Sequence, residues 1–167
     1  ATRTKYDMEV VYFTYTAALD EQTNAVAKYI AGYAEDVNGD GEINIQVVNC
    51  SFNGKSGDTQ YRYTMMTKLQ AMIAGDQNAM LFITDEDSYK YLADLSNGDG
   101  LFDGEPFMLG EEFYKSTETD SYGKLPEGLR IVCRRVSDTV LESKKGSADA
   151  HTNAEKTLEA IKSGKKN

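Results

Sequence analysis

Several residue types that mark a site are scarce in this sequence. Its 167 residues include no tryptophan, one histidine, two cysteines and two prolines. The cysteines, Cys50 and Cys133, are far apart, and with a single histidine they argue against a zinc site built from Cys and His. Two cysteines also make no disulfide framework. Each lies in a strand pattern where a free thiol packs as a small apolar group, although one bridge between them remains open.

Positive charge is scarce as well. Lys and Arg number 18 against 27 Asp and Glu, so the formal net charge is −9 and the isoelectric point is about 4.6. Nucleic acid is therefore not an expected partner, because its binding depends on neutralising phosphates with Lys and Arg. The same charge argues against an anionic membrane surface.

Long apolar runs are missing too, since none reaches the roughly 18 residues that span a bilayer. The chain begins Ala-Thr-Arg-Thr, without Met. We therefore expect a leader or anchor upstream of residue 1, so that any membrane attachment is made through that anchor.

Apolar periodicity predicts strands that alternate with helices. Runs of β-branched and aromatic residues predict strands at 8–16, 43–50, 79–84 and 129–136. Apolar residues three and four apart predict helices that begin near Asp20, Asp58, Thr84 and Asp149. The pattern predicts an α/β fold, a three-layer sandwich with a mostly parallel sheet, in a single domain over residues 1–167.

The periodicity dissolves between Gly98 and Gly128. This stretch, with its two ends included, holds six glycines and both prolines. We predict a long irregular loop at 98–128, with one helical turn at 111–115. Loops of about 30 residues are uncommon inside a domain and tend to be functional or mobile.

The most specific motif lies between the first helix and the second strand. It matches the first two thirds of a calcium-binding loop, in which side-chain oxygens at alternate positions converge on one ion and a glycine allows the turn. The candidate metal ligands are Asp36, Asn38, Asp40, Glu42 and Asn44. Position 12, where an EF-hand has a bidentate Glu, is Val47 here, so we expect a weak Ca²⁺ site at most. The alternative is a plain turn, because Asn-Gly and Asp-Gly readily adopt positive φ.

Three segments resemble the first lobe of extracellular solute-binding proteins of the type II periplasmic-binding class. They are the opening strand with its helix and Asn-Gly-Asp-Gly turn, the run 68–76 followed by 81–85, and 91–95 leading into 100–102. The resemblance extends over most of 8–136 and includes uncharacterised, membrane-anchored ectodomains of gut Firmicutes. It implies an extracellular location on a bacterial cell. Those proteins close two lobes around a ligand, whereas this chain has length for one.

Polar residues follow each predicted strand, where open α/β sheets bind their ligands. The candidate ligand-binding residues are Thr14, Tyr15, Thr16, Ser51, Asn53, Thr84, Asp85, Ser137 and Asp138. Such groups suit a sugar, an amino acid or a peptide. The alternative is that they are ordinary caps and turn residues, which have the same composition.

No catalytic motif accompanies these residues. The sequence has no Gly-x-Ser-x-Gly elbow, no complete phosphate-binding loop and no dinucleotide fingerprint. We therefore predict a non-catalytic extracellular binding module for a small solute. The alternative is a structural or interaction ectodomain that binds a protein partner through the 98–128 loop and the many tyrosines. A hydrolase is the third reading, and a close pair of carboxylates in a cleft would favour it.

Overall fold

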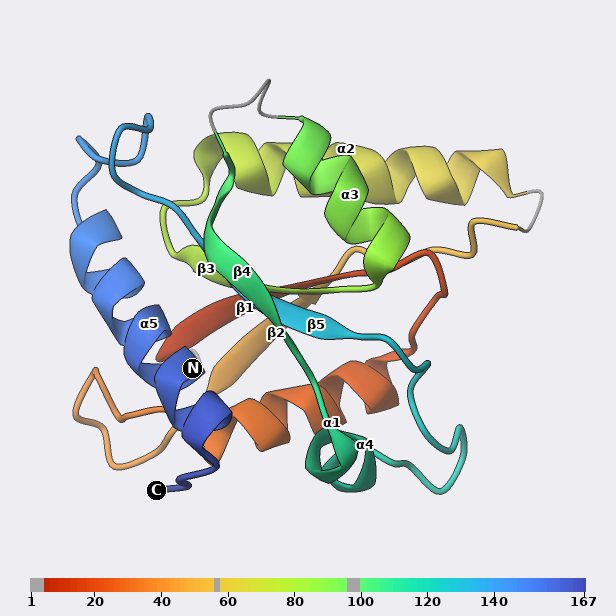
Figure 1. The fold of residues 1–167 in the computed structure, drawn as a ribbon, viewed down its shortest axis with the longest axis horizontal. Helices are drawn as coiled ribbons and strands as arrows, with labels where there is room; N and C mark the ends of the chain where they lie inside the picture. The colour runs from red at the N-terminus through yellow and green to blue at the C-terminus, as the bar shows by residue number, and fades with distance from the viewer. Residues whose placement is uncertain (1–4, 56–57, 96–99) are drawn as a thin grey trace.

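The computed structural model describes residues 5–55, 58–95 and 100–167, so the first four residues and positions 98 and 99 of the predicted loop lie outside it. Within these ranges strands and helices alternate along the chain (Figure 1). The elements are β1 (Met8–Phe13), α1 (Asp20–Ala31), β2 (Ile45–Asn49), α2 (Thr59–Gly75), β3 (Ala79–Thr84), α3 (Glu86–Asp94), β4 (Phe102–Met108), α4 (Glu111–Ser116), β5 (Arg130–Arg134) and α5 (Ser147–Ser163). The predicted α/β class is confirmed.

The sheet is mixed, so the prediction of a mostly parallel sheet is not confirmed. Its strand order is β2-β1-β3-β5-β4. β1 pairs in parallel with β2 and β3, whereas β5 runs antiparallel to both β3 and β4. Only the first half of the chain therefore follows the parallel pattern that its alternating elements predict.

The predicted loop at 98–128 is wrong in its first half, because β4 and α4 lie there. β4 was not predicted because its sequence, FDGEPFM, contains Gly104 and Pro106, which both disfavour strands. They are tolerated because β4 is an edge strand whose register with β5 shifts between Asp103 and Phe107. The helical turn predicted at 111–115 is confirmed as α4.

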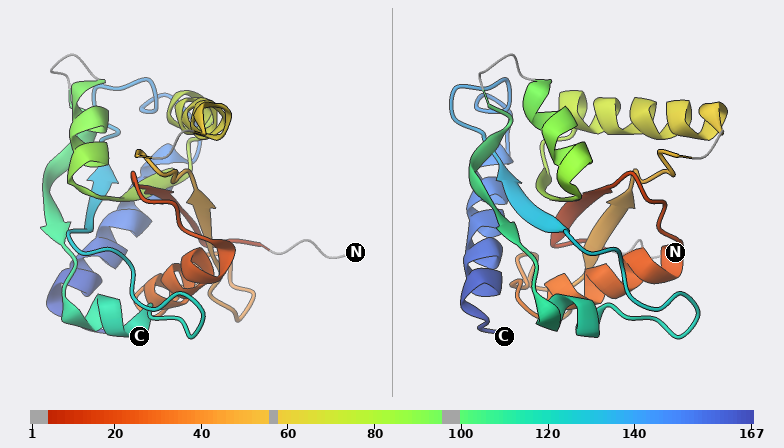
Figure 2. Two further views of the ribbon diagram at one scale, coloured as in Figure 1. Left: turned by 90° about the vertical axis from the view of Figure 1, so that its right-hand side faces the viewer. Right: turned by 45° about the vertical axis from the view of Figure 1, so that its right-hand side comes forward.

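Helices lie against both faces of the sheet (Figures 1 and 2). One apolar cluster joins Val10 and Leu81 to α1, α4 and α5, and the other joins Val11 and Phe82 to α2 and α3. Neighbouring residues of β1 and β3 thus point into different clusters, as strand geometry requires. All six residues of β3 are buried, which explains its uninterrupted apolar sequence.

The two cysteines are free and buried, one in each cluster. Because Cys50 and Cys133 lie on opposite faces of the sheet, a bridge between them is excluded in this fold. Among the described residues, the helices are too short or too polar to cross a bilayer.

Truncating the centre of the sheet should unfold the protein at much lower denaturant. Phe82 is fully buried in β3 and packs edge-on against Phe102, with ring centroids 5.4 Å apart. We expect Phe82→Ala to lower the free energy of unfolding by about 3–5 kcal/mol. Val140→Ala is the control, since Val140 is 68% exposed and its truncation should cost less than about 0.5 kcal/mol. Urea melts of both variants measure the difference, and similar midpoints would contradict the packing described.

Candidate functional site

A polar cleft lies where three parallel strands end. The loops after β1 and β2 and the start of α3 enclose about 620 Å³. The lining residues are Tyr15, Thr16, Asn53, Gly54, Lys55, Asp85 and Asp87. Four of the residues predicted to bind a ligand, Tyr15, Thr16, Asn53 and Asp85, are therefore brought together from three separate segments.

The cleft lies at a point where the chain connections diverge. β1 leads into α1 on one face of the sheet, and its neighbour β3 leads into α3 on the other face. The backbone N–H of Tyr15 donates to Asp85 Oδ2 (2.8 Å) across this gap. Ser88 N donates to the other oxygen of Asp85 (2.8 Å), so Asp85 also caps α3. Asp85 thus fixes the two walls relative to each other.

One wall of the cleft is aromatic and held rigidly. The Tyr15 ring lies 5.7 Å from Phe13, edge-on, and 5.2 Å from Phe52. Arg62 lies over the Phe52 ring, 5.2 Å from the ring centroid. Partial burial raises the pKa of the Tyr15 hydroxyl, although the nearby Arg62 charge opposes this. Tyr15 therefore stays a neutral hydrogen-bonding group with an apolar ring.

Gly54 allows the opposite loop to approach this wall. Its N–H donates to the carbonyl of Tyr15 (3.0 Å). A Cβ built on Gly54 would lie only 3.2 Å from the Tyr15 Cβ, closer than most real contacts. A glycine is therefore favoured here by the close approach of two backbones.

Three other predicted ligand-binding residues are buried and do not line the cleft. The Thr14 hydroxyl donates to the Thr16 carbonyl (2.7 Å), and Ser51 Oγ accepts from the Ala18 N–H (2.8 Å). Thr84 is fully buried in β3. For Thr14 and Ser51 the alternative interpretation, that they are caps and turn residues, describes their contacts.

Ser137 and Asp138 were expected at the same edge as the others, and this was wrong. β5 is antiparallel to β3, with Thr84 opposite Arg130 and Leu81 opposite Cys133. The carboxyl end of β5 therefore lies beside the amino end of β3, at the opposite end of the strands from the cleft. The prediction failed because it took β5 to run parallel to the other strands.

The predicted calcium loop is held closed by its own backbone. Asp36 accepts from the N–H groups of Gly39 (2.9 Å) and Gly41 (2.8 Å), and Asp40 accepts from Glu42 N (2.9 Å). Both glycines have positive φ, of 71° and 86°. These are the contacts of a turn, which the alternative interpretation predicts.

The other candidate ligands of this loop, Asn38 and Asn44, also bond within it or to its anchor. Asn38 Oδ1 accepts from Asp40 N (3.1 Å), and the N–H of Asn44 donates to Asp7 Oδ2 (2.8 Å). Asp7, which is buried, also accepts from Val37 N (2.9 Å). Among the described residues, the carboxylates of the loop do not form a group of three with ligand atoms within 4.8 Å of one another. Calcium binding here stays a prediction.

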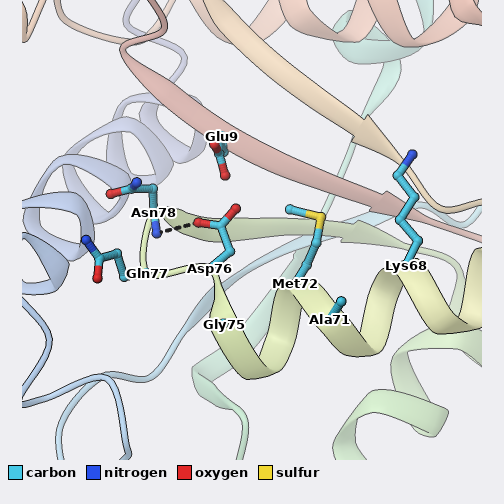
Figure 3. A pocket seen from close by; sticks show the side chains of 8 residues that line it. All are labelled: Glu9, Lys68, Ala71, Met72, Gly75, Asp76, Gln77 and Asn78. Atoms are coloured by element: carbon cyan, nitrogen blue, oxygen red, sulfur yellow. Dashed lines mark hydrogen bonds between the residues drawn. The ribbon is translucent and has the colours of Figure 1, made fainter.

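A second hollow, of about 660 Å³, lies at the amino-end edge of the sheet (Figure 3). Glu9 from β1 points towards Asp76, which follows α2, and Asn78 N donates to Asp76 Oδ1 (2.8 Å). The Asp76 carboxyl group is the neighbouring acid that acts on Glu9. Oε2 of Glu9 is buried and has no hydrogen-bond partner. The sequence signal for this pair was an acid near the start of a buried strand, which the prediction did not use.

The environment of Glu9 favours its protonated form. Burial, and after it the neighbouring Asp76 carboxyl group, raise the pKa of Glu9 from 4.5 to about 8. Arg134 lies near enough to Asp76 for their charges to attract, and burial lowers the pKa of Arg134. The raised pKa favours the protonated form of Glu9 near neutral pH.

Comparison with known proteins adds nothing to this geometry: no family model, curated protein or solved structure matches the chain. The resemblance to solute-binding proteins is therefore still a prediction.

Glu9 should make the protein less stable as the pH rises. A folded-state pKa near 8 against an ordinary 4.5 means that the stabilisation is complete below about pH 4.5 and is lost through about pH 8. Glu9→Gln keeps a neutral hydrogen-bonding group at every pH. We expect the free energy of unfolding of the wild type to fall by at least about 1 kcal/mol more than that of the variant between about pH 5 and 9.

Urea melts across this pH range measure the effect. Glu118→Gln is the matched control, because Glu118 is exposed and should follow the wild-type curve. Parallel curves for Glu9→Gln and the wild type would show that Glu9 is ionised in the folded protein.

Proposed function

We propose that this protein is a non-catalytic binding module for a small polar solute, bound in the cleft lined by Tyr15, Asn53, Lys55, Asp85 and Asp87. Support comes from one observation above all: the cleft lies beyond the carboxyl ends of β1 and β3, where their connections leave to opposite faces. Ligands of open α/β sheets bind at such points. The proposal includes a fold of the single-lobe, three-layer type and an extracellular location on an anchored bacterial protein.

The charges of the cleft favour a ligand that carries both signs. Lys55 and Asp87 are exposed on its lining, and Asp85 is half-buried between them and the sheet. An ammonium group fits the carboxylate side and a carboxylate fits Lys55, while the Tyr15 ring offers an apolar wall. Among a sugar, an amino acid and a peptide, these groups suit an amino acid or a short peptide best.

A hydrolase is supported less well. Glu9 and Asp76 are a close pair of carboxyl groups in a hollow, which is the feature that such an enzyme would need. In glycoside hydrolases the two groups stand about 5–9.5 Å apart, to leave room for sugar and water. Glu9 is half-buried and points towards Asp76 rather than outward, so the pair is poorly placed to flank a substrate.

A protein partner is the alternative, and α2 is the feature that favours it. Leu69 is the one buried residue among the 17 of this helix. Tyr61 and Tyr63 near its start are 42% and 68% exposed. Tyrosines are enriched at protein interfaces, since they combine an apolar ring with a polar tip.

The cleft proposal predicts that an amino acid or short peptide raises the melting temperature of the purified domain, because the ligand binds only the folded state. A panel of amino acids, dipeptides and sugars at millimolar concentration is screened by thermal melting. Asp87→Asn and Lys55→Gln should each weaken the binding of the active compound at least about tenfold, as lost charge pairing costs about 1.4 kcal/mol or more.

Asp94→Asn is the matched control, because Asp94 is an exposed acid at the other end of α3. It should bind as the wild type does. A panel without any shift would count against the cleft and move support to a protein partner on α2.

The 36–44 loop stays a proposal for weak Ca²⁺ binding, with an expected Kd of about 10⁻⁴ to 10⁻³ M. With a Kd near 1 mM, 10 mM Ca²⁺ would add about 1.4 kcal/mol of stability, or roughly 3–5 °C of melting temperature for a chain of this size. Asp40→Asn keeps an oxygen that accepts from Glu42 N but removes the charge, so the shift should disappear. A melt that is the same in EDTA and in Ca²⁺ would leave the loop a turn.

A further inference from the structure

A histidine and two acids meet on the α5 side of the sheet, away from both hollows described above. His151 Nε2 lies 2.6 Å from Asp103 Oδ2, and His151 Nδ1 lies 2.8 Å from Glu155 Oε1. His151 and Glu155 are one turn apart on α5, and Asp103 comes from β4. These residues take no part in the cleft or in the Glu9 pair.

We propose that Asp103, His151 and Glu155 form a binding site for a divalent transition-metal ion, and that Zn²⁺ fits it best. Each side chain offers a ligand atom, and the three atoms lie within 4.8 Å of one another. A point between three such atoms is less than about 3 Å from each, so small side-chain rotations reach the 2.0–2.2 Å of zinc bonds to His and carboxylate.

The donor set selects the kind of ion. One imidazole nitrogen with two carboxylates suits zinc, whereas Ca²⁺ and Mg²⁺ prefer oxygen alone. The ion would take the place of a proton on one ring nitrogen. The carboxylate that faces the other ring nitrogen would turn from that nitrogen to the ion, which completes the three protein ligands.

The backbone holds the three ligands in place from two elements. Asp103 lies opposite Cys133 in the sheet register, and α5 packs on that part of the sheet through Ala154 and Leu158. The fold therefore brings the three side chains together without an ion, and rotations of the side chains would complete the site.

Solvent reaches the cluster, as metal exchange requires. The His151 side chain is 18% exposed, and those of Asp103 and Glu155 are 40% and 54% exposed. Three protein ligands leave one position of a tetrahedral ion for water. The sequence argument against zinc counted only Cys and His as ligands, and it therefore overlooked two carboxylates that the fold brings to the single histidine.

The rival explanation is an ion pair alone, with a doubly protonated imidazole between two carboxylates. A carboxylate only accepts, so each contact then needs a ring N–H. The two explanations differ in one measurable respect, since only the metal site binds Zn²⁺ with one ion per chain and loses it when a ligand is removed.

The test is a Zn²⁺ titration of the untagged, EDTA-treated chain against a coloured chelator. We expect one tight site in the wild type, weakened at least about tenfold in Glu155→Gln and in His151→Gln. Glu159→Gln is the matched control, because Glu159 lies one turn further along α5 and pairs with Lys162. Asp40→Asn separates this site from the 36–44 loop. Both controls should bind as the wild type does.

NMR gives a second readout that does not depend on a variant folding. The chain has one histidine, so its imidazole signals belong to His151 without ambiguity. They should move on addition of one equivalent of Zn²⁺ and stay in place with Ca²⁺. Unmoved signals, or zinc affinities that are equal in the wild type and both ligand variants, would leave an ion pair only and overturn the proposal.

Discussion

Burial of β1 and β3 on both faces is the constraint on which the rest of the structure depends. These adjacent parallel strands put alternate side chains into two separate apolar clusters. Each cluster has to be closed by helices, so the connections after β1 and β3 leave towards opposite faces. The strand-end cleft is a consequence of that divergence, because two chains that part at an edge leave a gap between them.

Polar groups at the two ends of this strand pair have different surroundings. At the carboxyl end, Thr14, Ser51 and Asp85 use their oxygens to hold loops and a helix start in place. The less buried residues that line the cleft are the ones that can contact a ligand. At the amino end, Glu9 points towards Asp76, and its raised pKa favours the protonated form, which avoids two adjacent charges.

The second half of the chain adds the two antiparallel strand pairings of the sheet. β4 forms the outer edge, and β5 returns antiparallel between it and β3. This return moves Ser137 and Asp138 to the far side. It also positions Asp103 beside α5, where it meets His151 and Glu155. One topological feature thus removes two residues from the expected site and assembles a different group of ligands.

Elements whose side chains repeat regularly could be predicted from the amino-acid sequence. β1, β2, β3 and the helices between them follow from periodicity, since burial on two faces or on one face leaves a visible pattern. Gly39 and Gly41 likewise marked a tight turn, because few other residues adopt positive φ. Tertiary structure alone decided the direction of β5, the strand at Gly104 and Pro106, and the meetings of Glu9 with Asp76 and of His151 with Asp103. Strands that pair from distant parts of the chain leave no local pattern in the sequence. The same is true of Glu9 and Asp76, which are 67 positions apart (76 − 9), and of Asp103 and His151, which are 48 positions apart (151 − 103).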